Sequence, residues 1–185
     1  KGLEHLSPLF NYIVNLQCLK VTYRNFKGEV FVWNIHPYYI KQYNNRWFLL
    51  ALNEEKQAIT NIPLDRIVEC SPINLKYKPT EIDFNEYFDD VISVTIPRNA
   101  EVEKILLKFS QQRFSYVTSK PLHWSQKIKD KEYCIIEISV IPNKELYSLL
   151  LSYGSDVEVL EPQTLREEIA KDIVEQYKKY FSCAD

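Results

Sequence analysis

Residues 18–69 form a series of short segments in which apolar and polar side chains alternate, and this rhythm limits the possible folds more than any other feature. Asn25-Phe26-Lys27-Gly28 and Asn44-Asn45 each separate two such segments. Because Asn and Gly tolerate positive φ, both stretches suit tight turns between antiparallel strands. The pattern predicts about five short strands, interrupted at His36-Pro37, that close into a small Sm- or SH3-like β-barrel.

The stretches on either side of this barrel have different patterns. Apolar spacings of three and four predict a helix over residues 3–19, with Ser7-Pro8 at its start. Beyond the barrel, residues 73–100 lose regular periodicity, and residues 81–90 hold five acidic groups and no basic one. We interpret residues 1–72 as a helix plus a barrel, and residues 73–100 as a linker.

Residues 101–185 alternate between strand and helix patterns. Asn143 suits a helix N-cap, Gly154 suits the position after a helix end, and Pro162 suits a helix start. The predicted order is βαββαβ with a terminal helix, which is the ferredoxin-like order, so the chain is expected to be an α+β protein with two small domains. Strands are predicted over residues 102–109, 123–129, 133–141 and 157–160, and helices over 111–118, 143–153 and 162–181.

Charge and cysteine spacing exclude several classes of protein. The 23 Lys and Arg residues against 25 Asp and Glu residues leave a net charge of −2, whereas domains that coat duplex DNA are usually strongly basic. The four cysteines show neither a Cys-x-x-Cys pair nor zinc-ligand spacing, which favours reduced thiols in the cytoplasm and no metal. No apolar run approaches the roughly 18 residues of a membrane span. Because the sequence lacks Met, we expect it to be part of a longer protein.

The sequence carries little that points to catalysis. A nucleophile elbow or a phosphate-binding loop needs clustered glycines, but Gly2, Gly28 and Gly154 stand alone. His5, His36 and His123 have no acidic residue at metal-binding helical spacing. We therefore expect neither enzymatic activity nor a cofactor.

Binding chemistry is better represented in residues 18–66, which hold seven basic and four acidic side chains. Aromatic rings on a small barrel can stack on bases while Arg and Lys contact phosphates. The structural alternative is that these aromatics pack in cross-strand pairs and that the charges are merely solvated. The basic residues are Lys20, Arg24, Lys27, Lys41, Arg46, Lys56 and Arg66, and the interleaved aromatics are Tyr23, Trp33, Tyr38, Tyr39, Tyr43 and Trp47.

The order of several motifs resembles the WYL domain family, followed by the C-terminal extension of that family, called WCX. The barrel part of the resemblance rests on Tyr23, on His36-Pro37-Tyr38, on Arg46-Trp47-Phe48-Leu49 and on Leu64-Asp65-Arg66-Ile67. The second part rests on residues 105–109, 123–126, 145–154 and 159–166. The resemblance covers almost the whole chain.

This resemblance implies a bacterial transcriptional regulator. Family members usually carry an N-terminal winged helix-turn-helix that binds DNA, and that domain is missing from this sequence. The WYL barrel would sense a single-stranded nucleic acid or a nucleotide-like effector. The WCX part would support dimerisation or sensing, and a homodimer is expected. A protein–protein or dimerisation module without a small ligand stays open as the alternative.

By position, the resemblance also implies a ligand groove. Arg66 would offer a planar fork to a phosphate or carboxylate, unless the neighbouring Asp65 neutralises it. Trp47 could equally pack inside the barrel. Phe48 lacks the hydroxyl of the family's name motif, and Pro63 stands where Arg is common, which favours weaker polyanion binding or a different ligand. The expected groove residues are Tyr23, His36, Tyr38, Trp47 and Arg66, flanked by Lys41 and Arg46.

Overall fold

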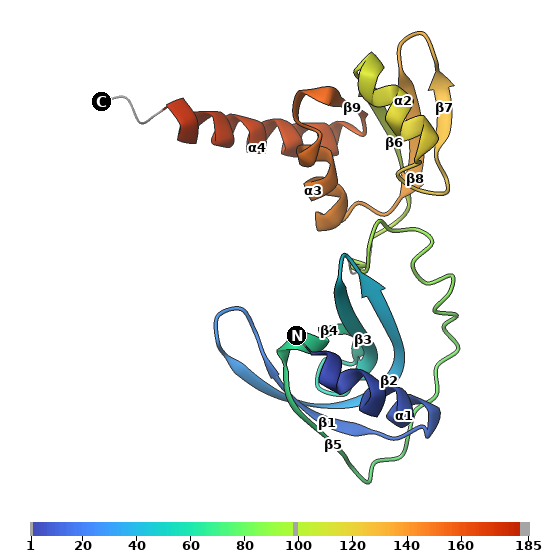
Figure 1. Ribbon diagram of the computed structural model, residues 1–185, viewed down its shortest axis with the longest axis vertical. Helices are drawn as coiled ribbons and strands as arrows, with labels where there is room; N and C mark the ends of the chain where they lie inside the picture. The colour runs from blue at the N-terminus through green and yellow to red at the C-terminus, as the bar shows by residue number, and fades with distance from the viewer. Residues whose placement is uncertain (1, 98–99, 182–185) are drawn as a thin grey trace. The chain divides into compact units, whose positions relative to one another are not determined.

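The structure is a computed structural model that describes residues 2–97 and 100–181. It divides into two compact units, unit 1 (residues 1–84) and unit 2 (residues 85–185), whose helices and strands are labelled in Figure 1. Each unit combines helices with one antiparallel sheet, so the expected α+β class is confirmed.

Unit 1 is built on a five-stranded antiparallel sheet of order β4-β3-β2-β1-β5. The predicted hairpin at Asn44-Asn45 is confirmed, since both residues have positive φ (47° and 59°), and Gly28 has φ 83° in the turn before β2. The elements are η1 (Leu3–His5), α1 (Leu6–Val14), β1 (Leu19–Arg24), β2 (Val30–Tyr43), β3 (Arg46–Asn53), β4 (Ala58–Pro63), η2 (Leu64–Arg66) and β5 (Ile67–Pro72).

Three expectations for unit 1 are corrected. The strand does not end at His36-Pro37, because a register shift between Pro37 and Tyr39 accommodates the proline within the single long strand β2. The first helix ends at Val14 rather than residue 19, and Leu16 then has φ 52°. The sheet does not close into a barrel, because the chain passes from β4 to β5 through the 3-10 turn η2, and β5 pairs with β1 only.

The core of unit 1 lies between α1 and the sheet. Leu9 of α1 packs fully buried against strand residues that include Leu19, Ile35 and Leu49. Gly2 has φ 81°, and a Cβ at this position would overlap the backbone of η2. The N-terminal turn is therefore seated directly against η2.

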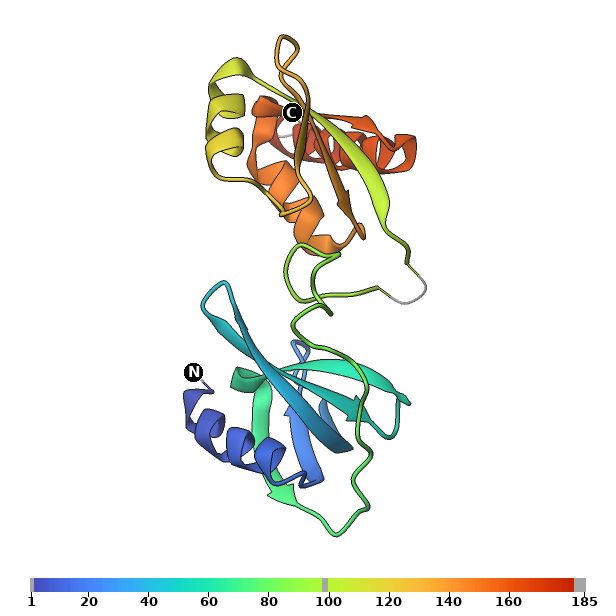
Figure 2. The same ribbon diagram turned by 90° about the vertical axis from the view of Figure 1, so that its right-hand side faces the viewer.

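Residues 73–84, which follow β5, form no helix or strand and run back along unit 1 (Figures 1 and 2). We call residues 73–84 the strap. Its first residue is held at both backbone groups: Ile73 N–H donates to the Cys18 carbonyl at 3.0 Å, and the Gln17 side chain donates to the Ile73 carbonyl at 3.0 Å. Its last residue, Phe84, is buried and stacks on the ring of Tyr39, with centroids 5.4 Å apart.

Unit 2 has the predicted βαββαβ order followed by a helix, and its antiparallel sheet has the order β7-β8-β6-β9. The strand expected over residues 123–129 starts only at Lys127. The preceding residues form a turn instead, in which Leu122 N–H donates to the Gln126 side chain and that side chain donates to the Val117 carbonyl. The elements are β6 (Glu103–Phe109), α2 (Gln111–Ser119), β7 (Lys127–Asp130), β8 (Ile135–Val140), α3 (Lys144–Ser152), η3 (Gly154–Asp156), β9 (Val157–Glu161) and α4 (Gln163–Phe181).

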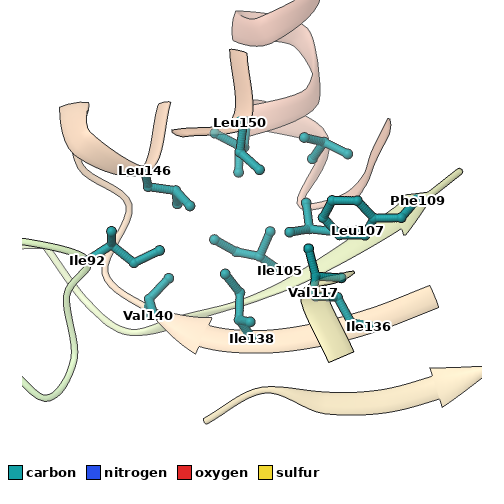
Figure 3. Packing of buried hydrophobic residues seen from close by; sticks show 12 residues of the cluster. Ile92, Ile105, Leu107, Phe109, Val117, Ile136, Ile138, Val140, Leu146 and Leu150 are labelled. Carbon is teal, nitrogen blue, oxygen red and sulfur yellow. The ribbon is translucent and has the colours of Figure 1, made fainter. Parts of the chain in front are cut away.

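The helices of unit 2 share one face of this sheet. Ile105 and Leu107 alternate on β6, and Ile136 and Ile138 on β8, all fully buried (Figure 3). They meet Val117 of α2, Leu146 and Leu150 of α3, and Leu165 at the start of α4. Apolar residues two apart on the strands and three or four apart on the helices therefore meet in one apolar cluster.

Asn143 joins α3 to the segment that precedes β6. Its side-chain oxygen accepts from Leu146 N–H at 2.8 Å, which confirms the predicted N-cap. Its amide nitrogen donates to the carbonyls of Ile92 and Thr95 at 2.8 and 2.9 Å, and the residue is 5% exposed. One side chain thus satisfies three backbone groups.

We expect Asn143→Ala to lower the free energy of unfolding of unit 2 by about 3 kcal/mol, from a helix cap and two buried hydrogen bonds of about 1 kcal/mol each. Urea denaturation followed by circular dichroism measures this change. Gln112→Ala, at an exposed position of α2, is the control and should change the stability by less than about 0.5 kcal/mol. Equal effects of the two substitutions would contradict the prediction.

Candidate functional site

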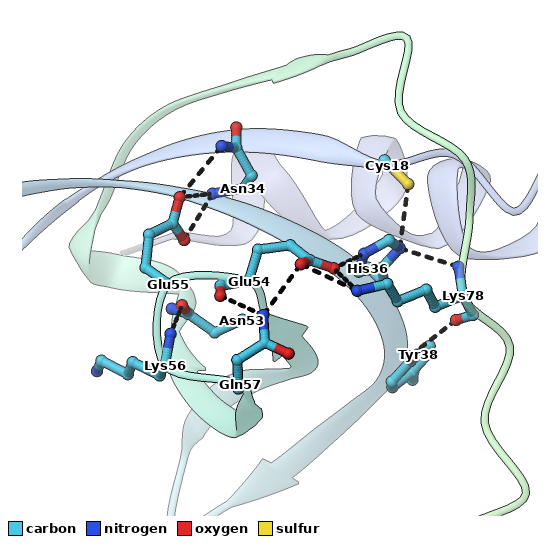
Figure 4. A network of polar contacts seen from close by, with 10 residues as sticks. All are labelled: Cys18, Asn34, His36, Tyr38, Asn53, Glu54, Glu55, Lys56, Gln57 and Lys78. Atoms are coloured by element: carbon cyan, nitrogen blue, oxygen red, sulfur yellow. Dashed lines mark hydrogen bonds and ion pairs between the residues drawn. The ribbon is translucent and has the colours of Figure 1, made fainter.

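His36 lies at the centre of a polar network in unit 1 (Figure 4). Its side chain is fully buried, and both ring nitrogens have partners. Nε2 lies 2.5 Å from Glu54 Oε1, and Nδ1 lies 3.2 Å from Cys18 Sγ. Nδ1 also accepts from Lys78 N–H of the strap at 3.1 Å. Because Nδ1 accepts the hydrogen bond from this backbone N–H, Nε2 is the ring nitrogen that donates a hydrogen bond to Glu54.

The charges around this network keep Glu54 ionised. Hydrogen bonds from Lys78 and His36 lower the pKa of Glu54 to about 2, and the Lys78 ammonium lies 2.7 Å from its carboxylate. Burial and the nearby Glu54 carboxylate raise the pKa of the Cys18 thiol. Burial, with Tyr38 and Cys18 as further causes, raises the pKa of Tyr77 to about 12. The thiol and the phenol are therefore neutral at physiological pH.

Tyr38 belongs to the same attachment of the strap. Its hydroxyl donates to the Lys78 carbonyl at 2.8 Å, and the Tyr77 hydroxyl donates to the Pro37 carbonyl at 2.8 Å. The rings of Tyr38 and Tyr77 meet edge to face at 5.9 Å. The structure thus brings His36 and Tyr38 together, but their polar atoms bind the strap.

A second cluster lies where η2 meets the end of β1. Tyr23 pairs with Ile67 in the sheet, which places the β1–β2 turn beside η2. The Arg66 guanidinium lies over the ring of Phe26, and its Nη1 is 3.4 Å from the Tyr23 hydroxyl. Phe26 is 85% exposed. These groups border an open pocket of about 240 Å³, lined by Arg24, Asn25, Phe26, Asp65, Arg66, Ile67 and Val68.

Asp65 forms its ion pair with Arg46 rather than with its neighbour Arg66. It accepts two hydrogen bonds from Arg46, both at 2.8 Å, and these bonds lower the pKa of the Asp65 carboxyl. The Arg46 guanidinium also lies 6.0 Å from the centre of the Phe26 ring. The guanidinium groups of Arg46 and Arg66 thus lie near one carboxylate, and Arg24 also lines the pocket, so the surplus positive charge suits an anion.

The remaining expected groove residues lie elsewhere in unit 1. Trp47 packs against the core and borders a shallow groove of about 470 Å³ beside α1, with Ile40, Leu6 and Phe10 among its other lining residues. Lys41 pairs with Phe48 across β2 and β3. The Tyr23 hydroxyl lies 3.4 Å from Arg66 Nη1, and its ring stacks on Trp33, with centroids 4.7 Å apart. Of the seven expected residues, Arg66 lines the pocket, Arg46 binds the lining residue Asp65, and Tyr23 contacts Arg66.

Sequence reasoning did not assign roles to Arg24 and Phe26 at the pocket, or to Cys18, Glu54 and Lys78 around His36. Phe26 did carry a signal, since an aromatic residue inside an Asn-to-Gly turn has no core to enter. The other four residues carry no such signal, because their contacts join segments that are far apart in sequence.

Two classes of site receive no support from the described residues. Within residues 2–97 and 100–181, no three His, Cys, Asp or Glu side chains gather as metal ligands, and no helix is long and apolar enough to cross a membrane. Cys18, Cys70 and Cys134 are free thiols, while Cys183 lies outside the described residues.

Together, the fold and the pocket define a two-unit α+β protein with a cationic, aromatic surface pocket on its first unit. Comparison with family models identifies a WYL domain at residues 4–72 and a WCX domain at residues 101–175. The chain belongs to the family of proteins that carry a WYL domain followed by a WCX domain.

The chain is also similar to several individual proteins. The chain is 22% identical over 169 residues to the uncharacterized HTH-type transcriptional regulator YobV of Bacillus subtilis (strain 168); the match covers 91% of the chain and 53% of that protein. The chain therefore spans about half the length of this curated relative. A solved structure described as a CRISPR Cas-related protein is 15% identical, with a TM-score of 0.64 over 100% of the chain and 54% of that protein. The proteasome accessory factor B/C of Arthrobacter aurescens is 16% identical, with a TM-score of 0.40 over 91% of the chain and 26% of its own.

The lowered pKa of Glu54 predicts how acid affects the strap. A carboxylate whose pKa is lowered by folding stabilises the folded state fully above its ordinary value, near 4.5, and this contribution disappears as the pH falls toward about 2. Glu54→Gln should therefore weaken the pH dependence of strap opening between pH 5 and pH 2. Hydrogen exchange of the strap amides across this range measures the effect. Glu69→Gln, at an exposed position, is the control, and a wild-type-like pH dependence in Glu54→Gln would contradict the prediction.

Proposed function

We propose that this chain is the effector-sensing region of a WYL-family transcriptional regulator, located in the cytoplasm. In this proposal unit 1 binds a single-stranded nucleic acid or a nucleotide-like effector. Binding then controls a DNA-binding domain elsewhere in the full-length protein. Support comes from the family, and from a relative that is named an HTH-type regulator and is about twice as long as the match.

The observation that carries the proposal is the combination of Arg24, Phe26 and Arg66 around one pocket. Guanidinium groups bind phosphates, and an exposed aromatic ring offers a face on which a base can stack. The volume of about 240 Å³ lies below the 300–1,000 Å³ or so of sites that enclose a drug-sized ligand. The pocket therefore suits one phosphate and an adjoining base at the surface, rather than a fully enclosed small molecule.

The finer fold assignments belong to the same proposal. We infer that unit 1 is an opened Sm-like barrel, since its sheet has five consecutive antiparallel strands with a 3-10 turn before the last. For unit 2, the βαββαβ order and the sheet order β7-β8-β6-β9 support a ferredoxin-like domain. Both are binding scaffolds in this account, with no enzymatic role.

A second candidate function is protein–protein assembly without a small ligand. The observation that favours it is the exposed apolar surface of α4, where Ile173, Tyr177 and Phe181 are 51%, 60% and 67% exposed. A chain that self-associates but binds neither oligonucleotides nor nucleotides would favour this second function over the first.

The effector proposal predicts that Arg66→Ala weakens binding of a short fluorescein-labelled oligothymidylate about tenfold or more. A charge-assisted contact contributes about 1.5–3 kcal/mol, and about 1.4 kcal/mol corresponds to a factor of ten. Fluorescence anisotropy at low and raised salt measures the affinity, which should fall with salt because phosphate contacts release counterions. Lys20→Ala, at an exposed position on β1, is the control for loss of one positive charge.

The melting temperature of Arg66→Ala should stay close to that of the wild type, because Arg66 has no ion pair within residues 2–97 and 100–181. Reduced thermal stability with unchanged affinity would instead assign Arg66 a structural role and sink the pocket proposal.

Asp65→Asn should have the opposite effect on binding. It removes the one carboxylate of the pocket lining and releases Arg46 from its ion pair, so the affinity for the same oligothymidylate should rise severalfold. The ion pair is partly exposed, so its loss should lower the free energy of unfolding by at most about 1 kcal/mol. Anisotropy titrations beside the wild type test this, and a reduced affinity would contradict it.

A further inference from the structure

The turn between β1 and β2 holds one wall of the pocket beside η2 in a fixed conformation. The Asn25 side-chain oxygen accepts from Lys27 N–H at 2.9 Å and from Glu29 N–H at 3.0 Å. Asn25 N–H in turn donates to the Glu29 carbonyl at 2.9 Å. Because these bonds fix the backbone of the turn, Arg24 and Phe26 line the pocket from a pre-organised segment.

A second wall is formed by η2 and is held just as firmly. Two hydrogen bonds from Arg46 fix the Asp65 carboxylate, and the Tyr23 hydroxyl lies 3.4 Å from Arg66 Nη1. Behind this wall, Gly2 lies so close to η2 that a Cβ would overlap the η2 backbone. Both walls are therefore set by contacts within unit 1.

The charges of the pocket do not balance. Its lining contains two cations, Arg24 and Arg66, and one carboxylate, Asp65, which is already paired with Arg46. Within residues 2–97 and 100–181, neither Arg24 nor Arg66 forms an ion pair. Two guanidinium groups thus border one small pocket without an acidic partner of their own, so the matching ligand carries about two negative charges.

The phosphate groups of nucleotides and nucleic acids differ in charge. An internal phosphodiester carries a single negative charge. A terminal phosphate monoester carries about −1.5 to −2 at pH 7 and has three strong acceptor oxygens. These oxygens can accept hydrogen bonds from two guanidinium groups at once. A monoester therefore matches both the charge and the donors of this pocket.

We propose that the pocket beside η2 binds a terminal phosphate monoester of a nucleotide or oligonucleotide rather than an internal phosphodiester. Arg24 and Arg66 contact the phosphate, and the terminal base stacks on the Phe26 ring. The volume of about 240 Å³ suits one phosphate and part of a nucleoside. This inference rests on the effector proposal and narrows its ligand to phosphorylated ends.

Three octathymidylates test the proposal: one with hydroxyl groups at both ends, one with a 5′-phosphate and one with a 3′-phosphate. Isothermal titration calorimetry needs no label, so both ends stay free. At least one phosphorylated octamer should bind about tenfold tighter or more than the unphosphorylated octamer, because it gains a charge-assisted contact. Thymidine 5′-monophosphate should compete with that octamer, and thymidine should not.

Two variants separate a pocket contact from a general effect of charge. Arg24→Ala should remove most of the preference for the phosphorylated end. Lys27→Ala removes the same charge from the same turn, but Lys27 does not line the pocket, so this control should keep the preference. Both side chains are exposed, and circular dichroism shows whether each variant is folded.

The preference should also grow between about pH 5.5 and pH 7.5, because a phosphate monoester loses its second proton near pH 6. The arginines stay charged in this range. The unphosphorylated octamer corrects for titration of the other groups near the pocket, which are Asp65, Tyr23 and His5, whose Nε2 lies 3.2 Å from the Ile67 carbonyl.

Equal affinities for all three octamers would overturn this proposal and leave the effector proposal standing. A preference that survives Arg24→Ala, or thymidine that competes as well as its monophosphate, would also overturn it. If none of the octamers binds, the effector proposal fails as well.

Discussion

The buried imidazole of His36 is the constraint on which the arrangement of unit 1 depends. A polar ring without access to water must find partners within the protein, and unpaired nitrogens would cost about 1–3 kcal/mol each. Its partners come from the start of β1, the end of β3 and the strap. Because Glu54 and Lys78 also bind each other, the strap is joined to the residue after β3 both directly and through His36.

The polar side chains described in unit 1 form two groups, one around His36 and one at η2. Around His36, each charge has a partner, so that end of the sheet serves attachment of the strap. At η2, by contrast, Arg46 forms the ion pair with Asp65, and the Arg66 guanidinium contacts the Tyr23 hydroxyl and the Phe26 ring. A surplus of positive charge beside an exposed aromatic ring is a feature of binding rather than of folding.

Much of the fold could be predicted from the sequence because its signals are local. The Asn44-Asn45 turn, the Asn143 cap and the alternation of β6 and β8 each depend on neighbouring residues. The break expected at His36-Pro37 was wrong, because a bulge lets a strand continue through a proline. Barrel closure was also wrong, since it depends on whether β4 and β5 pair, and no local pattern records that.

The candidate site was harder to predict for the same reason. In the sequence, nothing distinguishes the roles of His36 and Tyr38 from that of Arg66. The difference is that His36 and Tyr38 bind the strap, which lies about 40 residues further along the chain. Nor does the sequence reveal that Asp65 pairs with Arg46 across 19 residues rather than with its neighbour. Long-range partners, and not residue types, decide which cations remain available to a ligand.

The measurement that tests the central claim most directly is amide hydrogen exchange of the chain with and without a saturating thymidine oligonucleotide. The account predicts slower exchange in residues 24–26 and 65–68, which line the pocket, and unchanged exchange in the strap. Protection confined to the strap and residues 36–38, or to unit 2 alone, would contradict it.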